Sequence, residues 1–348
     1  MRLRPLPIHP LVAIALLSAL ACGRPPGGPG AVTPARAAAP LSAADVEALV
    51  GALAADSMEG RGTATPGGAR AARFIADRMQ SYGLVPAGDS GFFQPVTLAV
   101  TILPDGRRKL SPVAAGETPA QTTRVVNVVG IVRGTDPAVR DEAVLIDAHY
   151  DHLGIGPAEN GDSIYNGADD DASGVVAVLG AARAIAAGPP PRRTMVFLAT
   201  TGEELGLLGT QWYIAHPVVP LDRTVANLEI EMIGRPDSLA GGPGKGWLTG
   251  FERSTMGPRL AAAGIPVVAD PRPEQQFFQR SDNIAFARMG IPAHTLSSYG
   301  MHTDYHTPAD DVSRIDAAHL AAMVDAAARV ARMLADGEVP VWNAGGRP

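Results

Sequence analysis

Stretches rich in apolar and β-branched residues alternate with helix-like stretches along most of this chain, and this alternation limits the possible folds most strongly. Strands are expected at residues 124–132, 143–148, 194–200, 224–233 and 292–297. Helices are expected at residues 42–54, 68–82, 174–187, 205–216 and 316–335. The alternation predicts an α/β protein, built as a three-layer sandwich around a largely parallel mixed central sheet.

The first residues, 1–22, are typical of a signal peptide for export. Two arginines precede an apolar stretch, residues 11–21, which is shorter than the roughly 20 residues that a membrane-spanning helix needs. The only cysteine, Cys22, follows directly and resembles the residue that carries the lipid in bacterial lipoproteins. We expect a protein of the periplasm or cell envelope, or a secreted one. A lipid on Cys22 is its only expected link to a membrane, and simple cleavage after Ala21 is the alternative.

The rest of the chain divides into a linker and one folded domain. Residues 23–40 are mostly Gly, Pro and Ala without apolar periodicity, as in a flexible linker. The folded domain is expected at residues 41–340, a length that a single α/β domain can reach. The net charge is −6 and the chain has no run of Lys or Arg, so nucleic-acid binding is not expected.

Acidic and histidine residues gather where the predicted strands end. The clusters are His149-Tyr150-Asp151, GADDDASG at residues 167–174, Glu203-Glu204, Tyr305-His306 and the single residue Glu231. In open α/β sheets, ligands bind at the carboxyl ends of the strands. Buried carboxylates are costly unless a cation neutralises them, and histidine with carboxylate is a ligand set that zinc accepts. The sequence therefore predicts a metal site at one edge of the sheet.

Spacing within the clusters suggests a division of roles. His149 and Asp151 are two residues apart, so in an extended backbone their side chains point to the same side. Asp151 can then accept the free ring N–H of His149 and orient it. Glu203 and Glu204 are adjacent and diverge, so that one can bind metal while the other acts as a base toward water.

Each cluster taken alone has a simpler explanation. A single histidine is usually a surface or core residue, and adjacent acids often begin a helix because its positive dipole end favours them. It is the occurrence of all the clusters in one chain that favours a metal site.

The motifs resemble those of the M28 zinc aminopeptidases, in a bacterial and exported form. The likeness runs from residue 41 to about residue 334. It is carried by SMEGRGTATPGGARAARF, AHYDHLG, GDSIYNGADDDASGV, FLATTGEELGLLGT and DYHTPADD. It implies a phosphorylase/hydrolase-like zinc exopeptidase fold and an enzyme that removes residues from the free amino end of peptides.

The resemblance also implies two zinc ions and their ligands. His149 and Glu231 would bind one zinc, Glu204 and His306 the other, and Asp170 would bridge them. Glu231 stands where the family more often has aspartate, so the coordination differs there by one methylene. The three carboxylates and a bridging hydroxide would balance the four positive charges.

Further roles follow from the same resemblance. Glu203 corresponds to the general base, Asp151 to the residue that orients the metal-bound histidine, and Tyr305 to a residue that hydrogen-bonds the oxyanion. The peptide bond between Asp170 and Asp171 is expected to be cis. Glu229 is the alternative to Glu231, although the register before Met232 favours Glu231.

The remaining polar and aromatic residues near the motifs are not assigned to the site. The matched positions do not require His152, Asp169, Asp171, His302 and Asp304. His302 is the nearest spare ligand, and Asp310 and Asp311 are expected to cap a helix or support the site. Phe277 and Phe278 are expected in the core rather than in a substrate pocket.

Three other functions are compatible with this scaffold. A glutaminyl cyclase resembles these peptidases but works with one zinc, and both histidines and all three carboxylates are retained here. Carboxypeptidase-like enzymes and other zinc amidohydrolases share such a metal core. A non-catalytic binding module is the third, and loss of ligands would be its sign.

Overall fold

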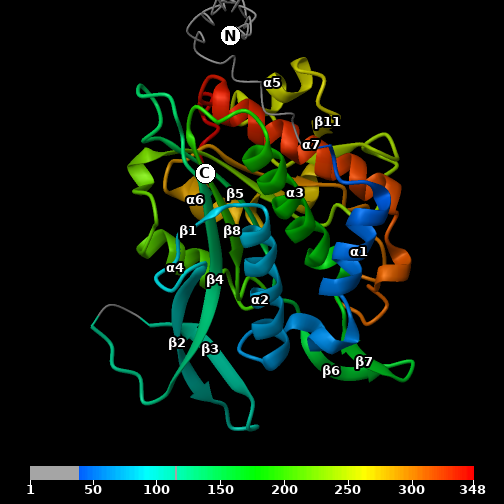
Figure 1. Ribbon diagram of the computed structural model, residues 1–348. Helices are drawn as coiled ribbons and strands as arrows, with labels where there is room; N and C mark the ends of the chain where they lie inside the picture. Colours follow the sequence, from blue (N-terminus) through cyan, green and yellow to red (C-terminus); the bar gives the residue numbers. More distant parts are fainter. Residues whose placement is uncertain (1–38, 114–115) are drawn as a thin grey trace, which may run out of the picture. The chain divides into compact units, whose positions relative to one another are not determined.

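The computed structural model describes residues 39–113 and 116–348 (Figure 1). The predicted signal peptide, with Cys22, and nearly all of the predicted linker lie outside the described residues. No helix in the described ranges combines the length and the apolar character needed to cross a membrane.

The described residues form twelve strands and seven α-helices. The strands are β1 Val85–Pro86, β2 Phe93–Ile102, β3 Arg108–Pro112, β4 Thr122–Val132, β5 Ala143–His149, β6 Gly154–Glu159, β7 Asp162–Tyr165, β8 Thr194–Thr200, β9 Thr224–Ile230, β10 Gly246–Leu248, β11 Val267–Ala269 and β12 Ala293–Ser297. The helices are α1 Ala43–Leu53, α2 Pro66–Ser81, α3 Gly174–Ala187, α4 Leu208–Ala215, α5 Met256–Ala262, α6 Asn283–Arg288 and α7 Ala317–Asp336. Shorter helical turns are η1 Asp56–Arg61, η2 Ala168–Ser173, η3 Leu221–Arg223, η4 Pro273–Gln275, η5 Phe277–Gln279 and η6 Val312–Arg314.

Ten of these strands form one mixed sheet, in the order β11-β10-β12-β9-β5-β8-β4-β2-β3, with β1 paired to β4. The four central strands, β12, β9, β5 and β8, are parallel to one another. The flanking pairs β10/β12, β4/β8, β2/β4 and β2/β3 are antiparallel. The central strands therefore all end at the same edge of the sheet.

Helices cover both faces of the sheet, which gives the predicted three layers. Strand β5 is buried along its whole length. Its residues Val144 and Ile146 pack with α1, α2, α3 and α7 on one face, whereas Leu145 packs with α4 and α6 on the other. Helices α3 and α7 lie side by side against the sheet (Figure 1). A strand apolar on both faces is typical of the centre of an α/β sheet.

Local sequence signals explain where the first helices begin. Ser42 accepts the N–H of Asp45 and the Asp45 carboxylate accepts the N–H of Ser42, so α1 begins with a capping box. Helix α2 begins at Pro66, and Thr65 before it accepts the N–H of Gly68. Proline suits the first helical position because the N–H it lacks would have no partner there.

Two predicted elements are shorter than expected because residues beside them adopt left-handed backbone angles. Helix α4 begins later than predicted, at Leu208, since Gly206 and Leu207 have φ angles of 102° and 61°. Strand β9 ends earlier than predicted, at Ile230, and Met232 beyond it has a φ of 50°. Both departures lie in the loops that carry acidic residues of the predicted metal site.

Several strands were not predicted. Strand β2 alternates buried and partly exposed residues, and its hairpin with β3 carries exposed polar residues. Strands β10 and β11 have three residues each, too few for a readable period. Strands β6 and β7 form a separate two-stranded sheet.

Candidate metal centre

The central parallel strands bring the predicted site residues to one edge of the sheet. His149 is the last residue of β5, and Glu203 and Glu204 follow the end of β8. Glu231 follows the last residue of β9, and His306 lies in the long loop after β12. Because these strands are neighbours and parallel, residues as far apart in sequence as 149 and 306 meet in space.

Asp170 reaches the same place from η2, which precedes α3. The peptide bond between Asp170 and Asp171 is cis, as predicted. The carboxylate of Asp310 accepts the backbone N–H groups of Asp169 and Asp170, each at 3.0 Å. Asp310 therefore supports the turn that carries Asp170, in line with its predicted supporting role.

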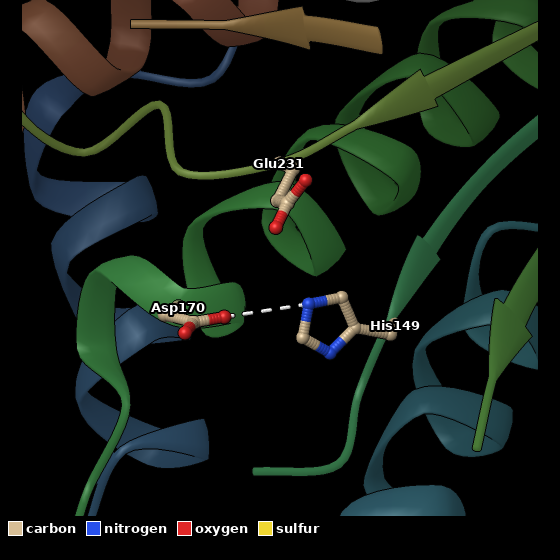
Figure 2. A group of neighbouring side chains, drawn as sticks. All are labelled: His149, Asp170 and Glu231. Atoms are coloured by element: carbon tan, nitrogen blue, oxygen red, sulfur yellow. Dashed lines mark ion pairs between the residues drawn. The ribbon is translucent and has the colours of Figure 1, made fainter. Parts of the chain in front are cut away.

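His149, Asp170 and Glu231 form a first cluster, which we call the inner group. Each offers a ligand atom, and these atoms lie within 4.8 Å of one another. Figure 2 shows the three side chains pointing toward one another from β5, from η2 and from the segment after β9. Nε2 of His149 is 3.3 Å from Oδ1 of Asp170. Two atoms bound to one tetrahedral zinc at about 2.0–2.1 Å are themselves about 3.3 Å apart.

The His149 ring is oriented by the backbone of Asp151. Nδ1 of His149 lies 3.1 Å from the carbonyl oxygen of Asp151 and 3.9 Å from its carboxylate. Since a carbonyl can only accept, Nδ1 carries a proton, and Nε2, which faces Asp170, is the nitrogen available to a metal ion. The Asp151 carboxylate instead accepts the Thr63 hydroxyl at 2.8 Å and the backbone N–H of Glu203 at 3.2 Å.

Asp170 also belongs to a second cluster, the outer group, with Glu204, His306 and His152. Nε2 of His306 lies 3.1 Å from Oδ2 of Asp170 and 3.2 Å from Oε2 of Glu204. Nδ1 of His152 lies 2.8 Å from Oε1 of Glu204. His152, Asp170 and Glu204 offer ligand atoms within 4.8 Å of one another. The outer group therefore holds two candidate histidines.

His152 is a candidate ligand that sequence reasoning set aside. Its side chain is buried, whereas that of His306 is 34% exposed. The ring packs on Gly167, where a Cβ would lie 2.5 Å from Cγ of His152, so glycine is needed there. His152 stands in the same AHYDHLG motif as His149, which was a usable signal.

Unpaired polar atoms show that the residues suit a cation. Nε2 of His149, Nε2 of His306 and Oε1 of Glu204 are buried and make no hydrogen bond of good geometry with the described residues, because their nearest polar neighbours are other members of the two groups. Buried polar atoms normally find a partner, and leaving one without costs about 1–3 kcal/mol. A metal ion accepting these lone pairs would remove that cost.

Crowding of carboxylates leads to the same conclusion. Burial raises the pKa of Glu203 well above its ordinary value and that of Glu231 to about 7. Burial alone would lower the pKa of His306, but the carboxylates of Asp170 and Glu204 outweigh it and raise this pKa to about 10. The cluster thus strongly favours added positive charge, which protons or metal ions can supply.

A small pocket of about 50 Å³ opens beside both groups. It is lined by Asp170, Glu203, Glu204, Glu231, Met232, Trp247, Thr249, Phe277, Arg280, Thr295, Ser297, Tyr299, Tyr305 and His306. The Glu203 side chain lies in this pocket without belonging to either group. The Tyr305 ring stacks on that of His306, with centroids 3.8 Å apart.

Several residues left out of the predicted site have other partners. Nε2 of His302 lies 3.0 Å from Oδ2 of Asp169, so His302 is engaged outside the two groups. Asp304 forms an ion pair with Arg235 at 2.8 Å. Asp311 accepts the N–H of Ser313 and caps η6, as expected of a capping residue.

The structure also shows where Glu229 and the pair Phe277 and Phe278 lie. Glu229, the alternative to Glu231, is buried and accepts the Ser281 hydroxyl at 3.0 Å. It belongs to neither group. Phe278 packs in the core as expected, but Phe277 lines the pocket, so the core prediction for Phe277 was incomplete.

Sequence reasoning missed Arg61, whose side chain is completely buried. Its guanidinium donates to the carbonyl oxygens of Tyr150 at 2.8 Å, Leu53 at 3.0 Å, Asn166 at 2.6 Å and Gly167 at 2.7 Å. These carbonyls belong to the end of α1, the loop after β5 and the segment before Asp170. Arg61 therefore ties together the end of α1, the loop that follows His149 and the segment that precedes Asp170.

Comparison with known proteins agrees with this arrangement. The profile of peptidase family M28 matches residues 127–331. A probable leucine aminopeptidase 2 of Aspergillus oryzae is 29% identical over 204 residues, which cover 55% of this chain. The chain spans 38% of the length of that relative and 19% of the length of two other curated relatives.

Solved structures share the fold. The aminopeptidase from Aneurinibacillus sp. strain AM-1 superposes with a TM-score of 0.62 at 18% identity, over 86% of this chain and 95% of that one. A glutaminyl cyclase of Porphyromonas gingivalis superposes with a TM-score of 0.58 at 19% identity, over 83% of this chain and 97% of that one. One scaffold thus carries both chemistries, and the site must decide between them.

Proposed function

The chain belongs to peptidase family M28, and from this premise we propose that it is a zinc-dependent aminopeptidase that hydrolyses the first peptide bond of peptides with a free amino end. The observation that carries the proposal is the pair of histidine and carboxylate groups that share Asp170 beside a pocket. A shared carboxylate is what two adjacent metal ions require.

Two zinc ions would use the residues that the site brings together. His149 and Glu231 would hold one ion, Glu204 with His306 the other, and Asp170 both. When bound, the ions would polarise the scissile carbonyl and acidify a water molecule. The longer Glu231, in place of aspartate, still reaches the inner group.

The chain's own residues would move the protons. Glu203 lies free in the pocket, and Asp151 holds its backbone N–H. Burial raises the pKa of Glu203, which makes its carboxylate a stronger proton acceptor. Glu203 would take a proton from the attacking water and pass it to the leaving amine. Tyr305 lines the same pocket and would donate its hydroxyl to the substrate carbonyl oxygen.

The proposal extends to location. The signal-like residues 1–22 support export to the cell envelope or beyond, and Cys22 is the residue on which a lipid would be attached. Mass spectrometry of the amino-terminal fragment from the native host tests this. An acylated Cys22 would establish a lipoprotein, and an unmodified new terminus would establish simple cleavage.

A peptide panel tests the activity. The purified protein is incubated with peptides that have free or acetylated amino ends, with a chelator and after addition of zinc, and metal is counted by mass spectrometry. We expect release of single residues only from free peptides, loss with chelator, recovery with zinc and two zinc ions per chain. Loss of ammonia from peptides beginning with glutamine, without hydrolysis, would instead establish a cyclase. No reaction at all with zinc-loaded protein would favour a binding role.

A further inference from the structure

The pocket beside the metal centre has a continuous aromatic wall. Ring centroids lie 5.1 Å apart for Trp247 and Phe277, 6.0 Å for Phe277 and Tyr299, and 5.5 Å for Tyr299 and Tyr305. Tyr305 in turn stacks on His306. Trp247, Phe277 and Tyr299 are buried, so these rings are held in place. The wall can contact the apolar stem of a substrate residue held at the metal centre.

One cationic side chain, Arg280, lies on this wall at the exposed rim of the pocket. Its guanidinium carbon is 4.9 Å from the centre of the Phe277 ring. Burial raises the pKa values of Tyr299 and Tyr305, and the charge of Arg280 opposes both rises. Arg280, Tyr299 and Tyr305 line the same pocket.

Arg280 differs from neighbouring arginines in having no acidic partner. Arg272 pairs with Asp237 at 2.6 Å, and Arg235 pairs with Asp304 at 2.8 Å. Within residues 39–113 and 116–348, no carboxylate lies within 4.0 Å of the Arg280 guanidinium. A guanidinium stacked on a ring keeps its in-plane N–H donors free, and these match the two oxygens of a carboxylate.

The carboxylates of the pocket have other roles than pairing with Arg280. Asp170, Glu204 and Glu231 belong to the two candidate metal groups, and Glu203 is the base in the proposed mechanism. Once metal ions neutralise the carboxylates of the two groups, Arg280 is the remaining cationic side chain on the pocket wall, and Glu203 is the remaining acid. It would attract an anionic group of the substrate.

We propose that Arg280 binds a carboxylate of the substrate, so that the enzyme prefers peptides with a carboxylate near the scissile bond; this inference rests on the proposed aminopeptidase function. The carboxylate has two possible sources. It is the side chain of an amino-terminal aspartate or glutamate, or the carboxyl end of a dipeptide. In both cases the aromatic wall contacts the intervening carbon atoms.

Steady-state kinetics with the whole zinc-loaded protein test the proposal. Anilides of glutamate, aspartate, glutamine and leucine lack a carboxyl end, and Leu-Gly is compared with its amide. The variants are Arg280→Gln and Arg280→Lys. Arg288→Gln is the matched control, because Arg288 is exposed, lies on α6 outside the pocket and loses the same charge.

We expect Arg280→Gln to lower kcat/KM about tenfold for carboxylate-bearing substrates, mainly through KM, as loss of one charged hydrogen-bonded contact does. Lysine should restore part of the loss, and Arg288→Gln should change little. A loss confined to the acidic anilides identifies the side chain as the source. A loss confined to free Leu-Gly identifies the carboxyl end.

A binding measurement separates this proposal from the proposed function. Calorimetric titration of free glutamate and glutamine into zinc-loaded protein reports carboxylate recognition even if no peptide is cleaved. Tighter binding of glutamate that disappears in Arg280→Gln supports the proposal. Equal losses for all substrates would overturn it, and so would a wild type that prefers neither glutamate over glutamine nor Leu-Gly over its amide. Absence of any hydrolysis refutes only the aminopeptidase activity.

Discussion

The inner and outer groups share Asp170, yet the chain holds them in different ways. His149 is the last residue of a buried central strand and is 1% exposed. In the outer group, Glu204 and His306 lie on loops. The His306 side chain is 34% exposed. Groups on strands are positioned by the core, whereas groups on loops depend on the loops. The comparison predicts that, of the two proposed zinc ions, the one at the inner group would be bound more tightly.

Removing the shared carboxylate should erase the difference between the groups and have the largest effect. Asp170→Asn keeps the shape of the side chain but removes its charge, so we expect both metal ions to be lost. Activity should fall more than about 100-fold, beyond the 10–100-fold that changes outside the ligand shell cost. Metal content and kcat/KM measure this. Asp311→Asn, which alters a capping carboxylate outside both groups, should keep both metals.

Replacing single histidines should separate the groups. His306→Ala should lose only the outer metal, with activity down about 100-fold, while His149→Ala loses the inner one. His152→Ala should weaken the outer metal about tenfold, as a supporting residue does. Stepwise dialysis against a chelator with metal counting checks the order of release. Retention of the outer metal in His306→Ala together with its loss in His152→Ala would reverse the assignment of the two histidines.

Arg61→Lys should destabilise the segments that Arg61 connects, namely the loop after His149 and the segment before Asp170. An ammonium has three donors and cannot serve all the carbonyls that Arg61 bonds. The unpaired carbonyls should lower the free energy of unfolding by about 2 kcal/mol. Chemical denaturation measures this. Arg70→Lys, at a partly exposed ion pair with Glu59, should change stability by less than about 1 kcal/mol. Similar effects of both variants would mean that Arg61 does not tie the loops.

The last effect is confined to acidic pH and concerns β12, the strand that leads to the outer loop. His294 is buried on β12, and burial lowers its pKa to about 4. His294 takes up a proton below about pH 6.5 in the unfolded chain but only below about pH 4 in the folded chain. The free energy of unfolding therefore falls as the pH drops between these values. At pH 5 the loss should be about 2 kcal/mol relative to pH 7. Chemical denaturation in the presence of a chelator should show that the free energy of unfolding depends less on pH in His294→Gln than in wild type. An unchanged pH dependence would exclude His294 as the cause.

Periodicity and motif order were sufficient to predict the central strands and helices. Strand β8 and helix α3 have the predicted bounds, and five separate motifs pointed to one edge of the sheet. These features depend on residues close together in sequence, which apolar patterning reports directly.

Features that depend on how loops meet were beyond the sequence. Arg61 binds carbonyls of residues as distant in sequence as Asn166 and Gly167, and backbone carbonyls leave no mark in side-chain patterns. That both His152 and His306 approach Glu204 depends on the path of two loops. The place of Phe277 on the pocket wall likewise depends on contacts with Tyr299, 22 positions after it, and Trp247, 30 positions before it.

The order of the central strands along the chain also sets the order in which a growing polypeptide acquires its site. Ribosomal synthesis delivers His149, Asp170 and Glu231 well before His306. A nascent chain that ends before β12 already contains every residue of one metal-binding cluster and lacks the exposed histidine of the other. With the proposed function, a nascent chain would acquire the full set of ligands only after residue 306 has been synthesised, so a shorter polypeptide would lack the activity.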